Sequence, residues 1–371
     1  MTNTNYLCID DHQDNTLEAL LAILTDGNLK IHRRTPEKLE SQIERIREFI
    51  KENSPRAGLL LDLRLDMEPD DDGNRVPYRG PTLAQELRTR MAEHDLPAFP
   101  IVLWSVNAKL KRSFDGDESS HDLFDAVFEK DREVSDKPHV VKQQFVSLAS
   151  GYSKLENVGR CADLVGLSKE DEDSPIYAQF LHELSELFKH SARHEVAHFL
   201  LNQLIRRSGL LVTEPMLAAR LGVCIKSSVN AWPDLKSIIK ATEYSGIFGD
   251  AWPRWWWYKV EVWWSGLKDN QPGLRRLTAE ERVEFLNATL GLKLVPAAPL
   301  KPEYSTRFTT LCAGTSRPID ATDGLRLFSK NIRNWHDTGY VSTHAALERL
   351  NIAHWKLDPL EIERLQRLKE L

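Results

Sequence analysis

Three observations predict an α/β domain followed by a mostly α-helical one. Short apolar runs alternate with amphipathic segments through the first 155 of the 371 residues, as expected for strands separated by helices. Several of these apolar runs end at charged or polar residues. Beyond residue 175, helical spacing of apolar residues predominates. Alternation of this kind is typical of a parallel, doubly wound sheet with helices on both faces.

Five strands and four helices are predicted in the first region. The strands are expected at residues 5–10, 29–32, 57–61, 100–104 and 126–128. The helices are expected at residues 15–24, 36–51, 81–93 and 139–155, each with apolar residues on one face. Right-handed crossovers between parallel strands place ligands beyond the carboxyl ends of the strands. The functional residues should therefore follow the strands.

Polar side chains gather at these strand ends. Asp10 and Asp11 follow the first strand, and Asp62 follows the third. Ser105 follows the fourth strand and Lys130 follows the fifth. Because parallel strands end at one edge of a sheet, we expect the five side chains to converge. Three carboxylates so close repel one another unless a cation or a proton offsets their charge. The cluster therefore predicts a divalent-metal site.

This arrangement resembles the receiver domain of two-component response regulators, over residues 5–155. The resemblance implies a flavodoxin-like fold and a bound Mg²⁺. It implies that Asp10, Asp11 and Asp62 hold the metal together with the backbone carbonyl of Arg64. It also implies that Asp62 is the phosphoacceptor. Ser105 would be the switch hydroxyl and Lys130 would contact the phosphoryl group.

The resemblance implies a function in phosphorelay signal transduction. A histidine kinase or phosphotransfer protein would donate the phosphoryl group, and the phosphorylated domain would control the helical region. The sequence departs from the family in two places. Asp131 stands where the family usually has Pro, and an acidic insertion at residues 66–79 separates Asp62 from the next helix. An adaptor or docking protein that is never phosphorylated is therefore an alternative.

The chain is divided by its sequence pattern into a receiver-like domain (1–155), a linker (156–175) and a helical output or interaction domain (176–371). Residues 177–207 are expected to form a long helical stretch that contains HEVAH at residues 194–198. On a helix, His194 and His198 could share Zn²⁺ while Glu195 poises a water molecule. A zinc metallopeptidase is thus a second alternative, but it needs a third ligand that no familiar motif supplies. A structural helix is the simpler interpretation.

Residues 217–223 resemble the first helix and turn of a helix-turn-helix, which makes a DNA-binding regulator a third alternative. The second helix would begin near Lys226, and Pro233 would break it. Residues 1–155 hold 21 basic and 28 acidic residues, and the remainder holds 28 and 27. Neither region has the positive charge expected of a dedicated nucleic-acid binder.

Residues 252–264 hold six of the ten Trp residues, with helical spacing. Such a segment predicts either the core of the second domain or a surface for a protein partner. The terminal segment 357–371 has apolar residues near helical spacing and predicts docking or a homodimer.

The cysteines and the hydropathy pattern limit the cellular context. Cys8, Cys161, Cys224 and Cys312 form no CxxC pair, so neither a disulfide framework nor a cysteine zinc site is expected. No signal peptide is evident, and no apolar run approaches the roughly 20 residues that cross a bilayer. The expected location is the cytoplasm, without a membrane partner.

Overall fold

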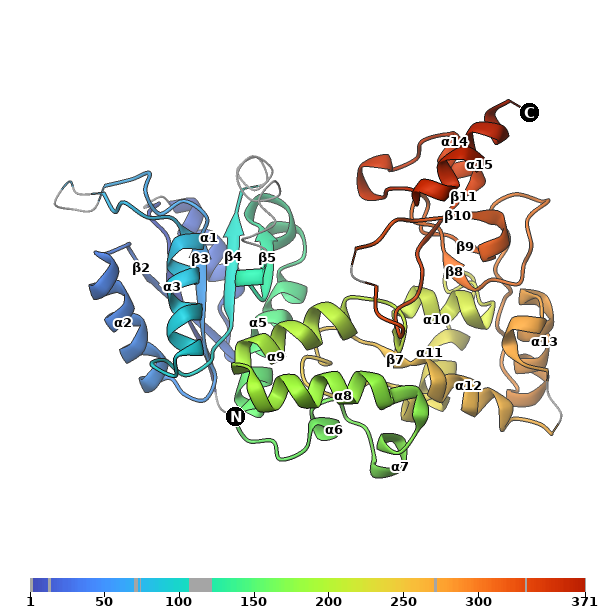
Figure 1. Ribbon diagram of the computed structural model, residues 1–371, viewed down its shortest axis with the longest axis horizontal. Helices are drawn as coiled ribbons and strands as arrows, with labels where there is room; N and C mark the ends of the chain where they lie inside the picture. The colour runs from blue at the N-terminus through green and yellow to red at the C-terminus, as the bar shows by residue number, and fades with distance from the viewer. Residues whose placement is uncertain are drawn as a thin grey trace. The chain divides into compact units, whose positions relative to one another are not determined.

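The computed structural model describes residues 3–12, 15–69, 73, 75–106, 122–269, 272–330 and 332–370. The chain forms two compact units (Figure 1). Unit 1 comprises Met1–Gln203 and Ser245–Trp252, and unit 2 comprises Leu204–Tyr244 and Pro253–Leu371. The sequence predicted domain boundaries at residues 155 and 175. These boundaries stay predictions, because they concern segments that would fold independently.

A five-stranded parallel sheet in the order β2-β1-β3-β4-β5 forms the centre of unit 1. Its strands are β1 (Thr4–Ile9), β2 (Leu29–Arg34), β3 (Ala57–Asp62), β4 (Ile101–Ser105) and β5 (Ala126–Glu129). All side chains of β3 and β4 are buried, as expected where helices cover both faces of a sheet. The predicted fold class is confirmed. The order is that of flavodoxin-like, receiver-type folds.

Two pairs of helices cover the two faces of this sheet (Figure 1). On one face, α2 (Leu39–Glu52) and α3 (Gly80–Ala92) pack on Leu7, Leu59 and Leu61. On the other, α1 (Asn15–Leu24) contacts α5 (Pro138–Leu155), which packs on β1 and β2. The hydroxyl of Tyr6 donates a 2.9 Å hydrogen bond to the carbonyl of Phe145 in α5. Alternate side chains of β1 therefore serve two different cores, as the two-residue period of a strand requires.

Further helices complete unit 1. They are α6 (Cys161–Leu164), α7 (Lys169–Glu172), α8 (Pro175–His190) and α9 (Arg193–Phe199). A π-helical segment at Leu200–Ile205 follows and contains the boundary between the two units. The single helical stretch expected over residues 177–207 is interrupted, because Ser191 and Ala192 adopt extended backbone conformations. The HEVAH segment therefore begins a new helix, and α9 contacts α5.

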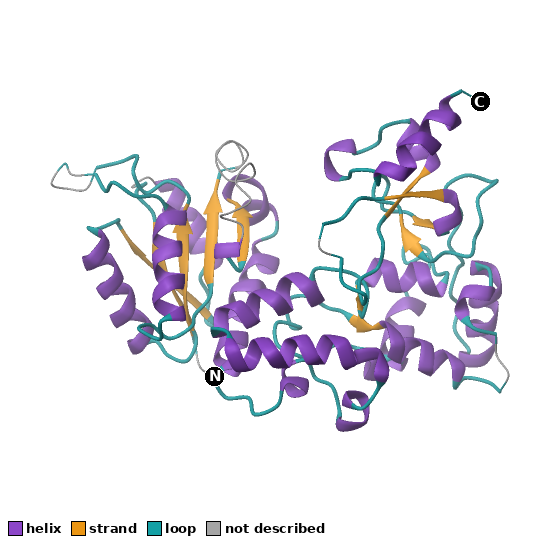
Figure 2. Cartoon of the chain, in the orientation of Figure 1, coloured by secondary structure: helices purple, strands orange, loops and turns teal. Residues whose placement is uncertain are grey.

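Unit 2 is mostly helical and also contains short antiparallel strand pairs (Figure 2). Its helices are α10 (Glu214–Leu221), α11 (Ala231–Ile238), α12 (Trp257–Ser265), α13 (Ala279–Leu290), α14 (Thr343–Leu347) and α15 (Pro359–Lys369). Its strands are β6 (Leu211–Val212), β7 (Trp255–Trp256), β8 (Thr310–Leu311), β9 (Pro318–Ile319), β10 (Gly324–Arg326) and β11 (Tyr340–Ser342). Strands of two or three residues are too short for a periodicity to reveal them.

The predicted helix-turn-helix does not form at α10 and α11. Helix α10 ends at Gly222, whose left-handed φ of 77° suits glycine. Helix α11 begins at Ala231 rather than near Lys226, so the connection is longer than the three to four residues of that motif. Pro233 lies in the first turn of α11, where its missing N–H breaks no helical hydrogen bond. The helix expected to begin near Lys226, which Pro233 was predicted to break, is absent from the described residues.

The Trp-rich segment contributes to the core of unit 2. Trp255, Trp257 and Trp264 belong to one cluster of buried residues, together with side chains from α10, α11 and α13. Tyr258 and Val262 are exposed on α12. A protein partner at this segment stays a prediction, and it would have to use the exposed side chains.

Helix α15 leaves Leu360 77% exposed. The predicted homodimer is not tested by this exposure. Across the described residues, no helix combines the length and the apolar character that crossing a bilayer would require.

We expect Gly58→Ala to destabilise the protein by about 2 kcal/mol, because overpacking a tight core costs roughly 1–3 kcal/mol. A Cβ at position 58 would lie 2.3 Å from Cε1 of Tyr6, between β1 and β3. Urea unfolding followed by circular dichroism measures the loss. The matched control is Gly27→Ala, since nothing lies within 4 Å of a Cβ at position 27. Equal stability of the two variants would contradict this account of the sheet core.

Candidate functional site

The strand ends of unit 1 bring Asp10, Asp62 and Lys130 into direct contact. The Nζ of Lys130 donates to Oδ2 of Asp10 at 2.6 Å and to Oδ1 of Asp62 at 2.6 Å. All three side chains are buried, and Asp62 is 1% exposed. Lys130 reaches this position because it follows β5, while Asp10 follows β1 and Asp62 ends β3.

The loop after β3 holds Asp11 in place. Oδ2 of Asp11 accepts hydrogen bonds from the backbone N–H groups of Met67 (2.7 Å) and Glu68 (3.0 Å). Oδ1 of Asp11 lies 3.0 Å from Nδ1 of His12. These amides belong to the acidic insertion predicted at residues 66–79, of which residues 70–72 and 74 lie outside the described part of the chain. The described start of the insertion thus covers one side of the acidic cluster.

Asp62 and Asp10 are each held at their second oxygen by a backbone amide. The N–H of Arg64 donates to Oδ2 of Asp62 at 2.7 Å, and the N–H of His12 donates to Oδ1 of Asp10 at 3.1 Å. The guanidinium of Arg64 is paired with Asp66 at 2.6 Å. The role expected for the backbone carbonyl of Arg64 stays a prediction.

Burial and charge act in opposite directions on this cluster. Burial raises the pKa of Asp62, and the negative charge of Asp10 adds to that effect, while Lys130 and the N–H of Arg64 oppose it. Burial alone would lower the pKa of Lys130, but the carboxylates of Asp62 and Asp10 outweigh it and raise that pKa. Lys130 is therefore held in its charged form, and one ammonium group faces three carboxylates once Asp11 is included.

Ser105 lies at the end of β4, paired in register with Glu129 of β5. Its hydroxyl is buried and has no hydrogen-bond partner among the described residues. A buried hydroxyl without a partner costs about 1–3 kcal/mol. The five residues predicted at the strand ends are thus all buried there, and Ser105 has an unused donor.

The acidic pair has the chemistry of a metal site. One ligand atom from each of Asp10, Asp11 and His12 lies within 4.8 Å of the others. Carboxylate oxygens suit Mg²⁺ or Mn²⁺, and an imidazole also suits transition metals. The residues present therefore fit a divalent cation, whose identity the donor set leaves open. His12 was not predicted, although its position next to Asp10-Asp11 was a signal available in the sequence.

A cavity of about 340 Å³ opens beside this cluster. Asp62 and Lys130 line it together with His12, Asp131 and Ser135. Leu17 and Leu20 of α1 form part of its apolar side. Asp131, at the position where receivers usually have Pro, thus faces the same space as the two central residues. The cavity is large enough to admit a small molecule to Asp62.

A second buried charge cluster surrounds Asp125. This residue directly precedes β5, at the end of the sheet opposite to the carboxyl ends of the strands. Asp125 accepts hydrogen bonds from Arg88 (2.9 Å), the N–H of Ile101 (2.8 Å) and the hydroxyl of Tyr152 (2.7 Å). Nε2 of His198 lies 3.2 Å from the same carboxylate. Burial alone would raise the pKa of Asp125, but Arg88 and His198 lower it overall.

The HEVAH segment is part of this second cluster. Nε2 of His198 contacts the carboxylate of Asp125. The guanidinium of Arg88 lies 3.5 Å from the same Nε2 atom, where its charge would repel a zinc ion. Glu195 is exposed and His194 is buried. Within the described residues, three metal-ligating side chains converge only at Asp10, Asp11 and His12. The contact with Asp125 thus accounts for the position of His198, and the described residues supply no third zinc ligand.

No protein-family model matches the chain, and no curated protein matches it. The geometry of the two units is accordingly the basis for assigning a function.

We expect Lys130→Met to lower the free energy of unfolding by about 3 kcal/mol at pH 7, because it leaves two buried carboxylates without their cation. The loss should shrink as the pH falls, since folded Asp62 with its raised pKa then takes up a proton more readily than the unfolded chain. Urea unfolding at several pH values measures both effects. Lys142→Met is the control, because its 3.2 Å pair with Asp26 is solvent-accessible and contributes less than about 1 kcal/mol. Equal losses in the two variants would rule out the buried bridge.

His194 should make the protein sensitive to acid. Burial, with Arg88 and His198 nearby, lowers the pKa of His194 to about 3. Below pH 6.5, His194 is protonated in the unfolded chain but stays neutral in the folded protein. The free energy of unfolding therefore falls as the pH drops from 6.5 toward 3, by up to about 4 kcal/mol. His194→Phe should flatten this dependence in urea unfolding, whereas His190→Phe on the exposed end of α8 should preserve it. An unchanged slope in His194→Phe would contradict this assignment.

Proposed function

We propose that unit 1 is a receiver-type signalling module in which Asp62 accepts a phosphoryl group. The observation that carries the proposal is the contact of Lys130 with both Asp62 and Asp10 beside an open cavity. A lysine in this position can remain close to Asp62 and pair with an oxygen of an incoming phosphoryl group. The phosphorylated module would then control the helical region.

The proposed reaction is a substitution at phosphorus. An oxygen of the Asp62 carboxylate attacks the phosphorus atom of a donor, and the bond from phosphorus to the leaving group breaks with its electron pair going to that group. The leaving group takes a proton from solvent, and Asp62 becomes an acyl phosphate. A divalent cation held by Asp10 and Asp11 would supply positive charge against the phosphoryl oxygens. Arg64 orients the nucleophile through its N–H bond to Oδ2 of Asp62.

Ser105 supports a switch role for the phosphorylated state. Its buried hydroxyl has no partner among the described residues, and a phosphoryl oxygen on Asp62 would offer an acceptor at the neighbouring strand end. Gaining this hydrogen bond would favour a conformation in which the β4 end moves toward β3, which is the kind of local charge change that biases a two-state element.

A second candidate function is a docking module that is never phosphorylated. Asp62 is 1% exposed, and each oxygen of Asp10, Asp11 and Asp62 already lies near a donor. In this version Lys130 replaces the metal as the counterion and the cluster only stabilises the sheet. The surface of unit 1 would then bind its partner in one fixed state.

The experiment that separates the two functions is phosphorylation of the intact protein by a small donor. With acetyl phosphate and Mg²⁺, we expect a base-labile mass gain of one phosphoryl group that Asp62→Asn removes. Asp66→Asn is the matched control, because Asp66 is a nearby acid paired with Arg64 outside the cluster. Asp11→Asn should reduce the yield at least about tenfold, as expected for loss of a metal ligand.

Failure to gain a phosphoryl group from acetyl phosphate, from phosphoramidate or from a phosphorylated histidine protein would reject the phosphoacceptor and leave the docking module. A gain that survives Asp62→Asn would reject the proposed site. If the gain is confirmed, a histidine kinase or phosphotransfer protein is the natural donor, since both present a high-energy phosphohistidine.

A further inference from the structure

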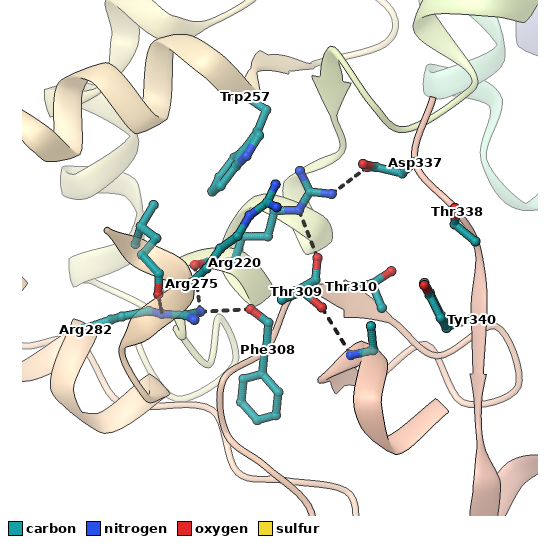
Figure 3. A pocket seen from close by; sticks show the side chains of 12 residues that line it. Arg220, Trp257, Arg275, Arg282, Phe308, Thr309, Thr310, Asp337, Thr338 and Tyr340 are labelled. Carbon is teal, nitrogen blue, oxygen red and sulfur yellow. Dashed lines mark hydrogen bonds and ion pairs between the residues drawn. The ribbon is translucent and has the colours of Figure 1, made fainter. Parts of the chain in front are cut away.

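Unit 2 contains a basic pocket of about 280 Å³ that none of the predicted motifs anticipated (Figure 3). Its charged lining consists of Arg220, Arg275, Arg282 and Asp337. Three arginines against one aspartate leave two positive charges in excess. The arginines come from α10, from the short 3-10 helix at Leu274–Arg276 and from α13, so the fold brings Arg220 to two arginines that lie far from it in the sequence.

Arg282 is the most unusual of these groups, because it is 1% exposed and has no carboxylate partner among the described residues. Its Nε donates to the carbonyl of Leu274 at 2.9 Å. Its Nη1 donates to the carbonyls of Arg220 and Phe308, each at 2.9 Å. Burying an unpaired charge is costly even when its donors are satisfied. An anion in the pocket would offset that cost.

The pKa of Arg282 agrees with this picture. Burial lowers it to about 10, although the charges of Asp320 and Glu281 act to raise it. Both acids have other partners: Asp320 accepts from Ser305, and Glu281 accepts from the N–H of Thr278. Neither Asp320 nor Glu281 forms an ion pair with Arg282. The positive charge of the Arg282 guanidinium is therefore not neutralised by a direct contact with either acid.

Two more donors of the pocket have no protein partner among the described residues. Arg275 is exposed and forms no hydrogen bond or ion pair there. The indole N–H of Trp257 is buried and unpartnered, and Figure 3 shows its ring extending from α12 toward the arginine side chains. Arg220 is anchored by Thr309 (3.0 Å) and Asp337 (2.5 Å), with its guanidinium 4.8 Å from the Trp257 ring centre.

We propose that this pocket binds the phosphoryl group of a small phosphate ester. The donors come from several separate elements, and such a set suits a tetrahedral group with three terminal oxygens better than a planar carboxylate. The excess of two positive charges matches the roughly −1.5 to −2 charge of a phosphate monoester at pH 7. Leu274 and Phe308 provide apolar lining for a small organic part. The volume is at the low end for ligand pockets, which favours a small metabolite.

The test is isothermal titration calorimetry of the intact protein with glycerol 3-phosphate at constant ionic strength. We expect saturable binding that Arg275→Ala weakens at least about tenfold, the scale of one lost charge-assisted hydrogen bond. Because Arg275 has no partner among the described residues, its removal should leave the circular dichroism spectrum unchanged. Trp257→Phe should also weaken binding while preserving an aromatic ring over Arg220.

Arg276→Ala is the matched control, since Arg276 is an exposed neighbour of equal charge that does not line the pocket. It should bind glycerol 3-phosphate as the unmodified protein does. The proposal is overturned by absence of saturable binding or by equal weakening in Arg275→Ala and Arg276→Ala. Succinate binding as tight as glycerol 3-phosphate would also overturn it, in favour of a carboxylate ligand.

Discussion

The bridge from Lys130 to Asp10 and Asp62 is the interaction on which the rest of unit 1 depends. Its three charges are buried, and their nitrogen–oxygen distances are 2.6 Å. Parallel strands force the carboxylates of β1 and β3 to the same edge of the sheet, where their repulsion must be offset. Lys130 does this from the end of β5, so the cation and the acids are held by different strands. Any ligand that reaches Asp62 must therefore bind beside an ammonium group that already contacts both Asp62 and Asp10.

The opposite edge of the sheet contains a second charge cluster with a different consequence. Asp125 is surrounded by Arg88, Tyr152 and His198, which come from α3, α5 and α9. The first cluster leaves a cavity beside Asp62, whereas the second is filled by protein donors. Asp125 thus ties the HEVAH helix to the sheet. Residue types that could ligate a metal form a structural contact here instead, because the neighbouring guanidinium of Arg88 repels another cation.

The two units place their polar groups under different constraints. In unit 1 the single charge of Lys130 offsets only part of a negative cluster of three aspartates. In unit 2 the arginine pocket is left with uncompensated positive charge, and the hydrogen bonds of the buried Arg282 guanidinium to described residues all go to carbonyl groups. Uncompensated buried charge is costly, so a pocket of this kind is better explained by a ligand than by stability. Each unit therefore has its own candidate binding chemistry.

Periodicity and strand-end residues predicted the sheet of unit 1 closely. The helix at Asn15–Leu24 has its expected bounds, and the five strand-end residues are buried where the topology requires. The sequence pattern did not reveal the break at Ser191 and Ala192, because apolar spacing continues across it. Nor did it reveal the short strands of unit 2 or the later start of α11. Two-residue strands carry no period, and helix ends depend on contacts made elsewhere.

Local patterns sufficed for the architecture of unit 1 and for the acids at its edge, because neighbouring residues encode strands, helices and their ends. The partners of those acids were decided by long-range packing. Whether Lys130 bridges two carboxylates, whether His198 meets Asp125, and whether Arg220, Arg275 and Arg282 share a pocket depend on side chains many residues apart. Desolvation and pairing of charges arise only when the elements pack, so only the tertiary structure could reveal them.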